Sequence, residues 1–411
     1  MTSTTSGGDR CCSTSRSSCA RFLRCSRGEV CRRVDRVLVI SQSHLARDPR
    51  VRRTVRVLLD DGWQVEGLFL DARQVGENLR TWRFPLDHKR NGVLRYLVEY
   101  SSFFVWSLLW VVWRVLVGRP ALVYVNSPPD LLVFAALPAR LLGVPVVLDE
   151  HDPMPELFAA KGRRSVITRR LLLAQERWSI RFANRVITVH EPLQQLFESR
   201  VPGVPIDVIM NVPDLEGWDS VSWDAGSRVL VFTGTVAVRY GLDDVIRAMS
   251  LTYRKIPGIR LRVVGDGEDL EALKALAGEL GVEDRLDCVG RVDHQEIPSF
   301  LAGAWVGVNV PKPDELGSLS FSNKIVEWVM LGFPVIAGRT QTLLRYFPEG
   351  TLLYVDPGSP ESIAERLVEL DQMGRDDVER NLERARAAVA QIAWPIQRAN
   401  LIRVIRETVG A

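Results

Sequence analysis

Residues 320–338 have the sequence SFSNKIVEWVMLGFPVIAG, in which a helical pattern passes directly into a strand pattern. Ser320 or Ser322 is placed to cap the start of the helix. Gly332 is typical of a helix end, and Pro334 opens the strand that follows. The free N–H groups and the positive dipole at a helix start attract phosphate. The segment therefore predicts an α/β unit with an anion site at the N-terminus of its helix.

The same alternation extends in both directions from this segment. Short β-branched runs and helical stretches follow one another over most of the chain, which is typical of parallel βαβ units in a doubly wound sheet. Strands are expected at 36–41, 65–70, 122–126, 146–149, 186–189, 208–210, 229–234, 261–265, 286–289, 306–310, 335–337 and 352–355, with helices that include 242–255, 270–280, 323–331 and 361–370.

One segment interrupts the alternation. Residues 211–227 are rich in Pro, Gly, Asp and Ser, so they are the predicted interdomain linker. We therefore expect two Rossmann-like domains, over residues 34–213 and 226–390, with a final helix at 394–411 that packs back on the first. Ligands of open α/β sheets bind beyond the carboxyl ends of the strands. Two such domains can share a central cleft.

The N-terminal stretch differs from the rest of the chain. Residues 1–36 contain eight Arg and three acidic residues, and five of the six cysteines lie there, whereas the remaining residues are nearly neutral. We interpret residues 1–33 as a disordered tail without the apolar core of a signal peptide, so a cytoplasmic location is expected. The near-neutral body also argues against nucleic-acid binding, which normally needs a basic surface.

Two charged residues lie on the helix of the opening segment. Lys324 is in its first turn and Glu327 follows at i+3, on the same side of the helix. A cation near a diphosphate and a carboxylate near ribose hydroxyls would hold a nucleotide. The alternative is an ordinary surface ion pair, and the spacing alone leaves both interpretations open.

The segment resembles the nucleotide-sugar signature of the family 4 glycosyltransferases, in which a helix with Lys and Glu runs into a Gly-x-Pro-Val-Ile-Ala turn. The resemblance implies the two-domain GT-B fold, a ribose contact for Glu327 and a phosphate contact for Lys324. Many members carry an earlier Glu, eight residues before, that touches the donor sugar. Leu319 occupies that position here.

A second segment, VFTGTVAVRYGLDDVIRAM at 231–249, resembles the family's strand, glycine turn and helix. Gly234 would let the backbone approach a ligand closely. The family usually has cations where this chain has Thr235 and Tyr240. Arg239 is the remaining cation of the loop, so it takes the phosphate role, and its alternative interpretation is a solvated loop arginine.

Two further segments, 262–273 and 288–311, complete the resemblance of the second half. Family members place the base near the residues that match Arg291 and Val292, and the turn at Gly265 and Asp266 lies at the mouth of the same cleft. The implied donor-binding residues are Gly234, Gly265, Asp266, Arg291, Val292, Ser322, Asn323, Lys324 and Glu327.

The first half carries the expected acceptor side. VLDEHDPMPELF at 147–158 resembles the family's Asp-x-His strand end, which would turn His151 toward the cleft; a structural histidine is the alternative. SHLARDPRVRR at 43–53 resembles its acceptor-side loop and supplies His44 and Arg50. In that loop Asp48 is also placed to cap a helix.

The resemblance implies a retaining transfer that needs no metal and no cofactor, from a nucleotide-sugar donor to a glycan or lipid-linked acceptor, as in the synthesis of cell-surface polysaccharide or glycolipid. Lys324 and Arg239 would meet the charge of the leaving diphosphate, and His151 would be the catalytic residue on the acceptor side. Two alternatives stay open. A nucleotide-sugar 2-epimerase shares the fold, and the replacement of the usual residues by Leu319, Thr235 and Tyr240 fits a non-catalytic partner subunit.

A last feature concerns membranes. Residues 101–118, SSFFVWSLLWVVWRVLVG, are strongly apolar, and residues 161–185 contain eight basic residues and one acid. The apolar stretch is either a buried core helix or a helix lying in the membrane interface. The second interpretation predicts peripheral attachment to the anionic inner face of the membrane.

Overall fold

The chain divides into a unit of residues 1–35 and a unit of residues 36–411. In the first, the described residues are Asp35 and two short strands, β1 (Leu23–Arg24) and β2 (Val30–Cys31), which pair antiparallel. The rest of the predicted tail and residues 215–222 of the predicted linker lie outside the described residues. The computed structural model describes residues 23–24, 30–31, 35–71, 76–85, 93–160, 162, 165–214, 223–293 and 296–410.

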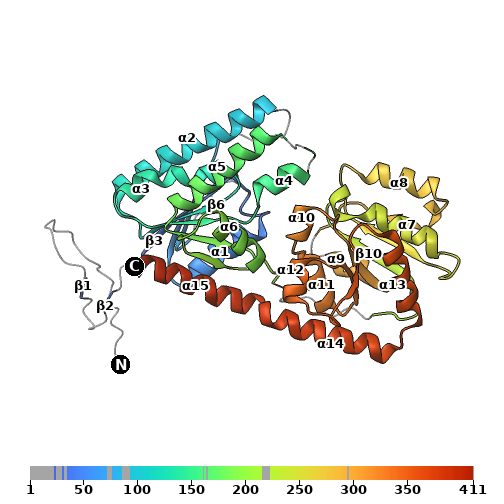
Figure 1. Cartoon of the computed structure of the whole chain (residues 1–411). Coiled ribbons are helices and arrows are strands. Elements are labelled where there is room, and N and C mark those ends of the chain that lie inside the picture. The colour runs from blue at the N-terminus through green and yellow to red at the C-terminus, as the bar shows by residue number, and fades with distance from the viewer. Residues whose placement is uncertain are drawn as a thin grey trace, which may run out of the picture. The chain divides into compact units, whose positions relative to one another are not determined.

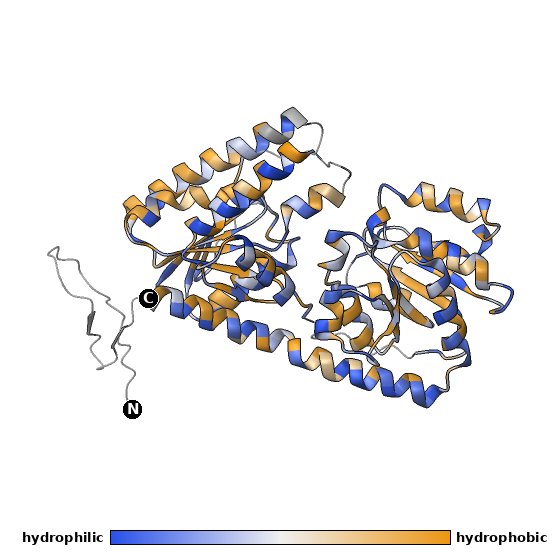
Figure 2. Cartoon of the chain, in the orientation of Figure 1, coloured by the Kyte–Doolittle hydropathy of each residue, from blue (hydrophilic) through white to orange (hydrophobic). Residues whose placement is uncertain are grey.

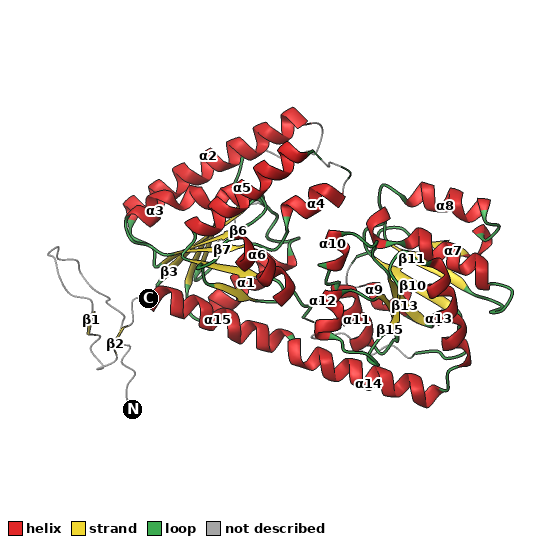
Figure 3. Ribbon diagram, in the orientation of Figure 1, coloured by secondary structure: helices red, strands yellow, loops and turns green. Residues whose placement is uncertain are grey.

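The larger unit contains two parallel sheets with helices on both sides (Figures 1 and 3). The first has the strand order β5-β4-β3-β6-β7-β8-β9, and its central strands β3, β6 and β7 are buried on both sides, as the runs of Val, Ile and Leu predict. These strands are β3 (Arg36–Ser41), β4 (Gln64–Phe69), β5 (Leu79–Arg83), β6 (Leu122–Asn126), β7 (Val146–Asp149), β8 (Arg185–Thr188) and β9 (Ile206–Val208).

Alternate residues of β3 belong to opposite layers of the first domain. Leu38 and Ile40 belong to the core on one side of the sheet, which a first group of helices covers. Val37 and Val39 belong to the core on the other side, which α1 (Pro49–Asp60) and α15 (Trp394–Gly410) cover. The first group comprises α2 (Val93–Val117), η1 (Asp130–Ala136), α3 (Leu137–Leu141), α5 (Val166–Phe182) and α6 (Glu191–Arg200), and α4 (Met154–Ala160) packs on α5.

The second sheet has the strand order β12-β11-β10-β13-β14-β15 and is also parallel. Its strands are β10 (Val229–Thr233), β11 (Arg260–Val264), β12 (Leu286–Cys288), β13 (Val306–Asn309), β14 (Val335–Gly338) and β15 (Leu353–Val355). Its helices are η2 (Val238–Tyr240), α7 (Leu242–Thr252), α8 (Leu270–Glu279), η3 (Glu283–Arg285), α9 (Ile297–Leu301), α10 (Glu315–Ser318), α11 (Asn323–Leu331), α12 (Gln341–Tyr346), α13 (Pro360–Gln372) and α14 (Arg375–Ile392).

The strand order decides where ligands bind. In each sheet the chain winds outward in one direction and then in the other, and the two directions part between β3 and β6 in the first sheet and between β10 and β13 in the second. Loops that leave neighbouring strands at such a point diverge, which opens a crevice beyond their carboxyl ends. The loops after β10 and β13 are therefore the ones expected to receive a ligand.

The last two helices link the domains. α14 packs on α11 of the second domain, and α15 packs on α1 of the first, where Leu401, Val404 and Ile405 are buried in its core. The Arg406 guanidinium also binds the Asp61 carboxylate at 2.5 Å.

Most expected strands occur within two residues of their predicted bounds, but β5 was not predicted. Its sequence, LRTWR, has a single fully buried residue, Thr81, and β5 is an edge strand that carries arginines at its exposed positions. Such a segment forms only because β4 offers it backbone partners. α2 also begins earlier than predicted, at Val93.

Candidate active site

A cavity of ≈ 300 Å³, called the cleft below, is lined by both domains. It brings together three of the predicted residues, His151 from the first domain and Arg239 and Asn323 from the second. The other residues that line the cleft are Asp152, Pro153, Leu157, Val189, His190, Leu193, Asn211, Tyr240, Pro311, Asp314, Leu316, Gly317, Leu319, Ser320 and Phe321.

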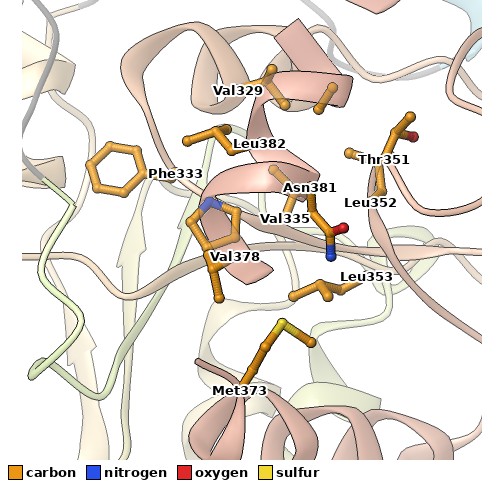
Figure 4. A pocket seen from close by; sticks show the side chains of 12 residues that line it. Val329, Phe333, Val335, Thr351, Leu352, Leu353, Met373, Val378, Asn381 and Leu382 are labelled. Carbon is orange, nitrogen blue, oxygen red and sulfur yellow. The ribbon is translucent and has the colours of Figure 1, made fainter. Parts of the chain in front are cut away.

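The N-terminus of α11 opens at this cleft. Ser322 occupies the N-cap position, but its side chain accepts no hydrogen bond from the first turn, so that turn keeps N–H groups available for an anion. The other end of α11 is held firmly. Val329 packs with Leu382 of α14 and with Phe333 around a crevice with room for about one water molecule (Figure 4).

Lys324 lies against two aromatic rings beside the cleft. Its ammonium nitrogen is 4.2 Å from the centre of the Tyr240 ring and 4.4 Å from that of Phe232. Burial lowers the pKa of Lys324 to about 8; Glu327 acts in the opposite direction, and the Arg239 guanidinium lowers the pKa further. Two cations therefore face the same region, an arrangement that a diphosphate would stabilise.

Glu327 is only 9% exposed, so the surface ion pair considered from the sequence is wrong. Burial raises the pKa of this carboxyl to about 7, partly offset by Lys324 and by Arg53 of the first domain. Arg53 also lies over the Trp394 ring and donates to the Asn211 side chain. A buried carboxylate with an elevated pKa is typical of a binding or catalytic site.

These two shifted pKa values predict how donor affinity depends on pH. A bound diphosphate would raise the pKa of Lys324, so affinity should fall as the pH rises above about 8. Ribose hydroxyls that donate to Glu327 would lower its pKa, so affinity should also fall as the pH drops below about 7. Calorimetry in buffers of different ionisation heat should record proton uptake on the alkaline side and release on the acidic side. Glu327→Gln should abolish only the release; a flat affinity profile would contradict the prediction.

Gly234 and Gly265 have a role that the sequence did not reveal. A Cβ on Gly234, whose φ is +104°, would lie 2.9 Å from Cε of Lys324, so this glycine makes room for the lysine. A Cβ on Gly265 would lie 1.8 Å from the Gly234 carbonyl oxygen. The loop after β10 and the turn after β11 thus pack backbone to backbone, joined by the bond from the Gly234 N–H to the Val264 carbonyl.

Gly265→Ala should therefore destabilise the second domain, at the upper end of the ~1–3 kcal/mol typical of overpacking. Gly278→Ala is the matched control, since Gly278 lies in α8 with nothing within 4 Å of the added Cβ. It should stabilise the protein by ~0.5–1 kcal/mol. Denaturant unfolding of both variants measures the difference, and equal stabilities would show that the two loops can separate without loss.

His151 follows β7 at the first-domain wall of the cleft. Its side chain is 22% exposed, its Nδ1 is 3.9 Å from Oδ1 of Asp149, and Nδ1 has no hydrogen-bond partner within the protein. This nitrogen is buried on the side of the Asp149 carboxylate, so a ligand in the cleft would meet the exposed part of the ring.

His190 is a second cleft histidine that the sequence analysis missed. It follows β8 as His151 follows β7, and that position after a strand end was the available signal. Its Nδ1 accepts from the Leu193 N–H at 3.1 Å. Burial lowers the pKa of His190 to about 4, and a hydrogen bond to the backbone of Leu319 in the second domain partly offsets this shift. Leu319, which stands where many family members have their first Glu, thus contacts a histidine of the first domain.

The structure does not bring Arg50 or His44 into the cleft. Arg50 is 7% exposed; its guanidinium binds the buried Asp149 carboxylate through two nitrogens and donates to the Ile209 carbonyl. It is a structural residue, which corrects its prediction as an acceptor contact. His44 is on the loop after β3, and its Nδ1 lies 3.5 Å from Oδ1 of Asp71.

Of the nine predicted donor contacts, Asn323 alone lines the cleft. Gly234, Gly265, Ser322, Lys324 and Glu327 have the positions described above, and the other three are Asp266, Arg291 and Val292. Asp266 accepts from the Gly267 N–H and so closes its own turn. Arg291 is exposed and Val292 half-buried on the loop after β12. Among the described residues, no group of three or more His, Cys, Asp or Glu side chains is arranged to hold a metal ion.

Comparisons with known proteins agree with this geometry. The family described as "Glycosyl transferases group 1" matches residues 227–372, and the "Glycosyl transferase 4-like domain" matches residues 48–212. The chain belongs to the family 4-like group 1 glycosyltransferases. As a glycosyltransferase of this family it transfers a sugar from a nucleotide-sugar donor, and its two parallel sheets form the GT-B fold.

Individual relatives of this glycosyltransferase differ in what they act on. A 2-deoxystreptamine N-acetyl-D-glucosaminyltransferase of Streptomyces fradiae is 27% identical over 66% of this chain and 72% of its own length. A GDP-mannose-dependent phosphatidylinositol monomannoside mannosyltransferase of Mycolicibacterium smegmatis is 31% identical over 34% of this chain and 37% of its own. The structure of Anabaena HepE with UDP-glucose superimposes with a TM-score of 0.67 at 18% identity, over 92% of this chain and 99% of the other.

Proposed function

We propose that this glycosyltransferase transfers its sugar with retention of anomeric configuration, without a metal ion, to a glycan or lipid-linked acceptor. The observation that carries the proposal is the placement of Lys324 and Arg239 beside the open N-terminus of α11, with Glu327 buried behind them. In this arrangement Glu327 accepts from the ribose, and the two cations meet the diphosphate.

Departure of the nucleoside diphosphate concentrates negative charge on the leaving oxygens. Lys324, Arg239 and the α11 N–H groups supply positive charge that is already in place, so little reorganisation is needed as the bond breaks. The sugar then passes through an oxocarbenium-like state. The acceptor approaches from the wall that carries His151, whose partly exposed imidazole can orient or deprotonate its hydroxyl.

The metal-independent part of this proposal has a direct test. Exhaustive treatment with EDTA should leave turnover unchanged, because protein cations neutralise the diphosphate. Loss of turnover that added Mg²⁺ or Mn²⁺ restores would refute it.

The names of the relatives point to acceptors of two kinds. One set modifies 2-deoxystreptamine, and another modifies phosphatidylinositol mannoside or lipopolysaccharide core. We place this glycosyltransferase in the cytoplasm, at the inner face of the membrane, where a lipid-linked acceptor would be found.

Radiolabelled nucleotide sugars test the function as a whole. A thermal-shift screen with UDP-, GDP- and ADP-sugars first identifies the donor, because a ligand that binds only the folded state raises the unfolding temperature. Incubation with that donor and a membrane extract should then give a labelled acceptor, and alkaline or enzymatic analysis of the linkage reports its configuration. Interconversion of the free donor would indicate an epimerase, and no conversion of any kind would indicate a non-catalytic subunit.

A further inference from the structure

The first domain carries an extended exposed apolar surface, which we call the apolar face. η1 packs against both α2 and α5, and α3 packs against α2, so these helices form one layer (Figure 1). Figure 2 shows that α2 is largely hydrophobic, and the large apolar side chains on the outer side of this layer are exposed. The apolar face consists of Val98, Val105, Trp106, Leu109, Trp113, Leu116, Val117, Leu131, Leu137, Leu141, Leu142, Val166, Ile167, Leu171 and Trp178.

α2 is anchored to the protein by its inner side. Phe103 and Val111 are fully buried, and Arg114 forms a buried ion pair with Glu66 of β4 at 2.6 Å. Residues Val98–Val117 are long and apolar enough to cross a membrane by length and composition. Because the inner side is part of the domain core, α2 can offer a bilayer only its outer side, whose Leu116 is 81% exposed.

α5 presents a mixed stripe of apolar and basic side chains. Ile167, Leu171 and Trp178 are 72%, 66% and 61% exposed, and the spacing of 4 and 7 residues puts them on one side of the helix. Arg170, Arg177 and Arg181 are exposed at the neighbouring positions of the same side. A helix with outward Trp, Leu and Arg is typical of attachment to the interfacial region of a bilayer.

The acidic and basic residues of these helices differ in burial. α2, η1, α3 and α5 contain three carboxylates, Glu99, Asp130 and Glu176, and all three are buried, at 4%, 1% and 1% exposure. Every exposed charge on them is therefore an arginine. Two copies of this surface placed against each other would bring arginines together, so the charge pattern disfavours a symmetric dimer and favours an anionic partner.

A second cavity lies between α5 and the cleft. Its volume is ≈ 680 Å³; it shares Asp314 and Leu316 with the cleft and extends to Thr168, Arg169 and Leu172 of α5. The inner side of α5 thus borders a cavity that neighbours the cleft.

We infer that the apolar face docks on an anionic lipid bilayer, with the Trp and Leu side chains in the interfacial region and the α5 arginines on lipid phosphates. Trp is favoured at that depth because its ring is amphipathic, and each arginine near an anionic surface adds to the attraction. The inference does not depend on which acceptor the enzyme uses.

Flotation with vesicles tests this inference on the full chain. The parent should float with vesicles that contain phosphatidylglycerol and remain behind with pure phosphatidylcholine. Arg170, Arg177 and Arg181 changed together to Gln should reduce partitioning roughly a hundredfold. Leu171→Glu with Trp178→Glu should abolish it. Binding by the parent should also weaken at about 1 M salt, where the Debye length is only ~3 Å.

Matched controls come from exposed positions of the second domain. Arg380, Arg384 and Arg386 of α14 changed to Gln, and Leu251→Glu on α7, should float like the parent. Equal binding to neutral vesicles, no binding at all, or the same loss in the controls would overturn the inference. So would a dimer in light scattering that Leu171→Glu and Trp178→Glu dissociate without any vesicle binding by the parent. Donor binding, measured without vesicles, should be the same in every variant, which separates this inference from the proposed function.

Discussion

Lys324→Met should lower kcat by about a hundredfold to a thousandfold, which is the loss seen when one preorganised donor to a developing oxyanion is removed. The lysine ammonium lies against Phe232 and Tyr240 near Arg239, and in the proposed function it meets the diphosphate from this protected position. Negative charge on the leaving group grows in the transition state. Turnover should therefore fall more than donor affinity does.

The measurement is turnover and donor affinity on the same preparation. Lys274→Met is the matched control, because Lys274 is an exposed residue of α8 that pairs with Glu271 at 2.8 Å. It should behave as the parent does, since exposed pairs contribute only ~0–1 kcal/mol. If Lys324→Met has a parent-like kcat, or if its donor affinity falls as far as its turnover, Lys324 does not stabilise the leaving diphosphate in the transition state.

Glu327→Ala should weaken donor binding roughly tenfold to a hundredfold. If the buried carboxylate accepts from the ribose, the variant loses a charge-assisted hydrogen bond worth ~1.5–3 kcal/mol, and each 1.4 kcal/mol changes affinity tenfold. Glu327→Gln keeps an acceptor at the same place, so it should bind with intermediate affinity. Calorimetry with the donor identified by thermal shift gives these values directly.

The charged neighbours of Glu327 indicate which result would contradict this prediction. Its carboxylate interacts with Lys324 and Arg53, so its removal could loosen the second domain without any part in binding. A lower unfolding temperature together with parent-like donor affinity would show that role and would sink the nucleotide-site assignment. Glu271→Ala, at an exposed position of α8, should change neither quantity.

Much of the fold was predictable because its signals are local. β6, β7 and α11 have the predicted bounds, since a β-branched run and a helical repeat that ends at a positive-φ glycine each depend on neighbouring residues alone. The roles expected of Lys324 and Glu327 came from i, i+3 spacing and the family resemblance. In the structure the two side chains lie close enough for their charges to interact.

The misses share a physical cause, which is dependence on distant partners. Arg50 appeared free for an acceptor, but Asp149 and Ile209, far along the chain, bind its guanidinium. β5 forms because β4 leaves an edge open, and His190 has a hydrogen-bond partner in the backbone of Leu319, which belongs to the other domain. None of these partners is visible in a local pattern.

By itself, the sequence determined the two α/β domains, the helix that presents Lys324 and Glu327, and the family resemblance, because periodicity, caps and motif spacing are encoded within short segments. Only the tertiary structure decided which groups meet across the cleft, that burial shifts the pKa values of Lys324 and Glu327 toward each other, and that the carboxylates of the outer helices are buried beneath their exposed arginines and tryptophans. Burial and the distances between charges depend on how distant segments pack, and for that reason they appear only once the chain has folded.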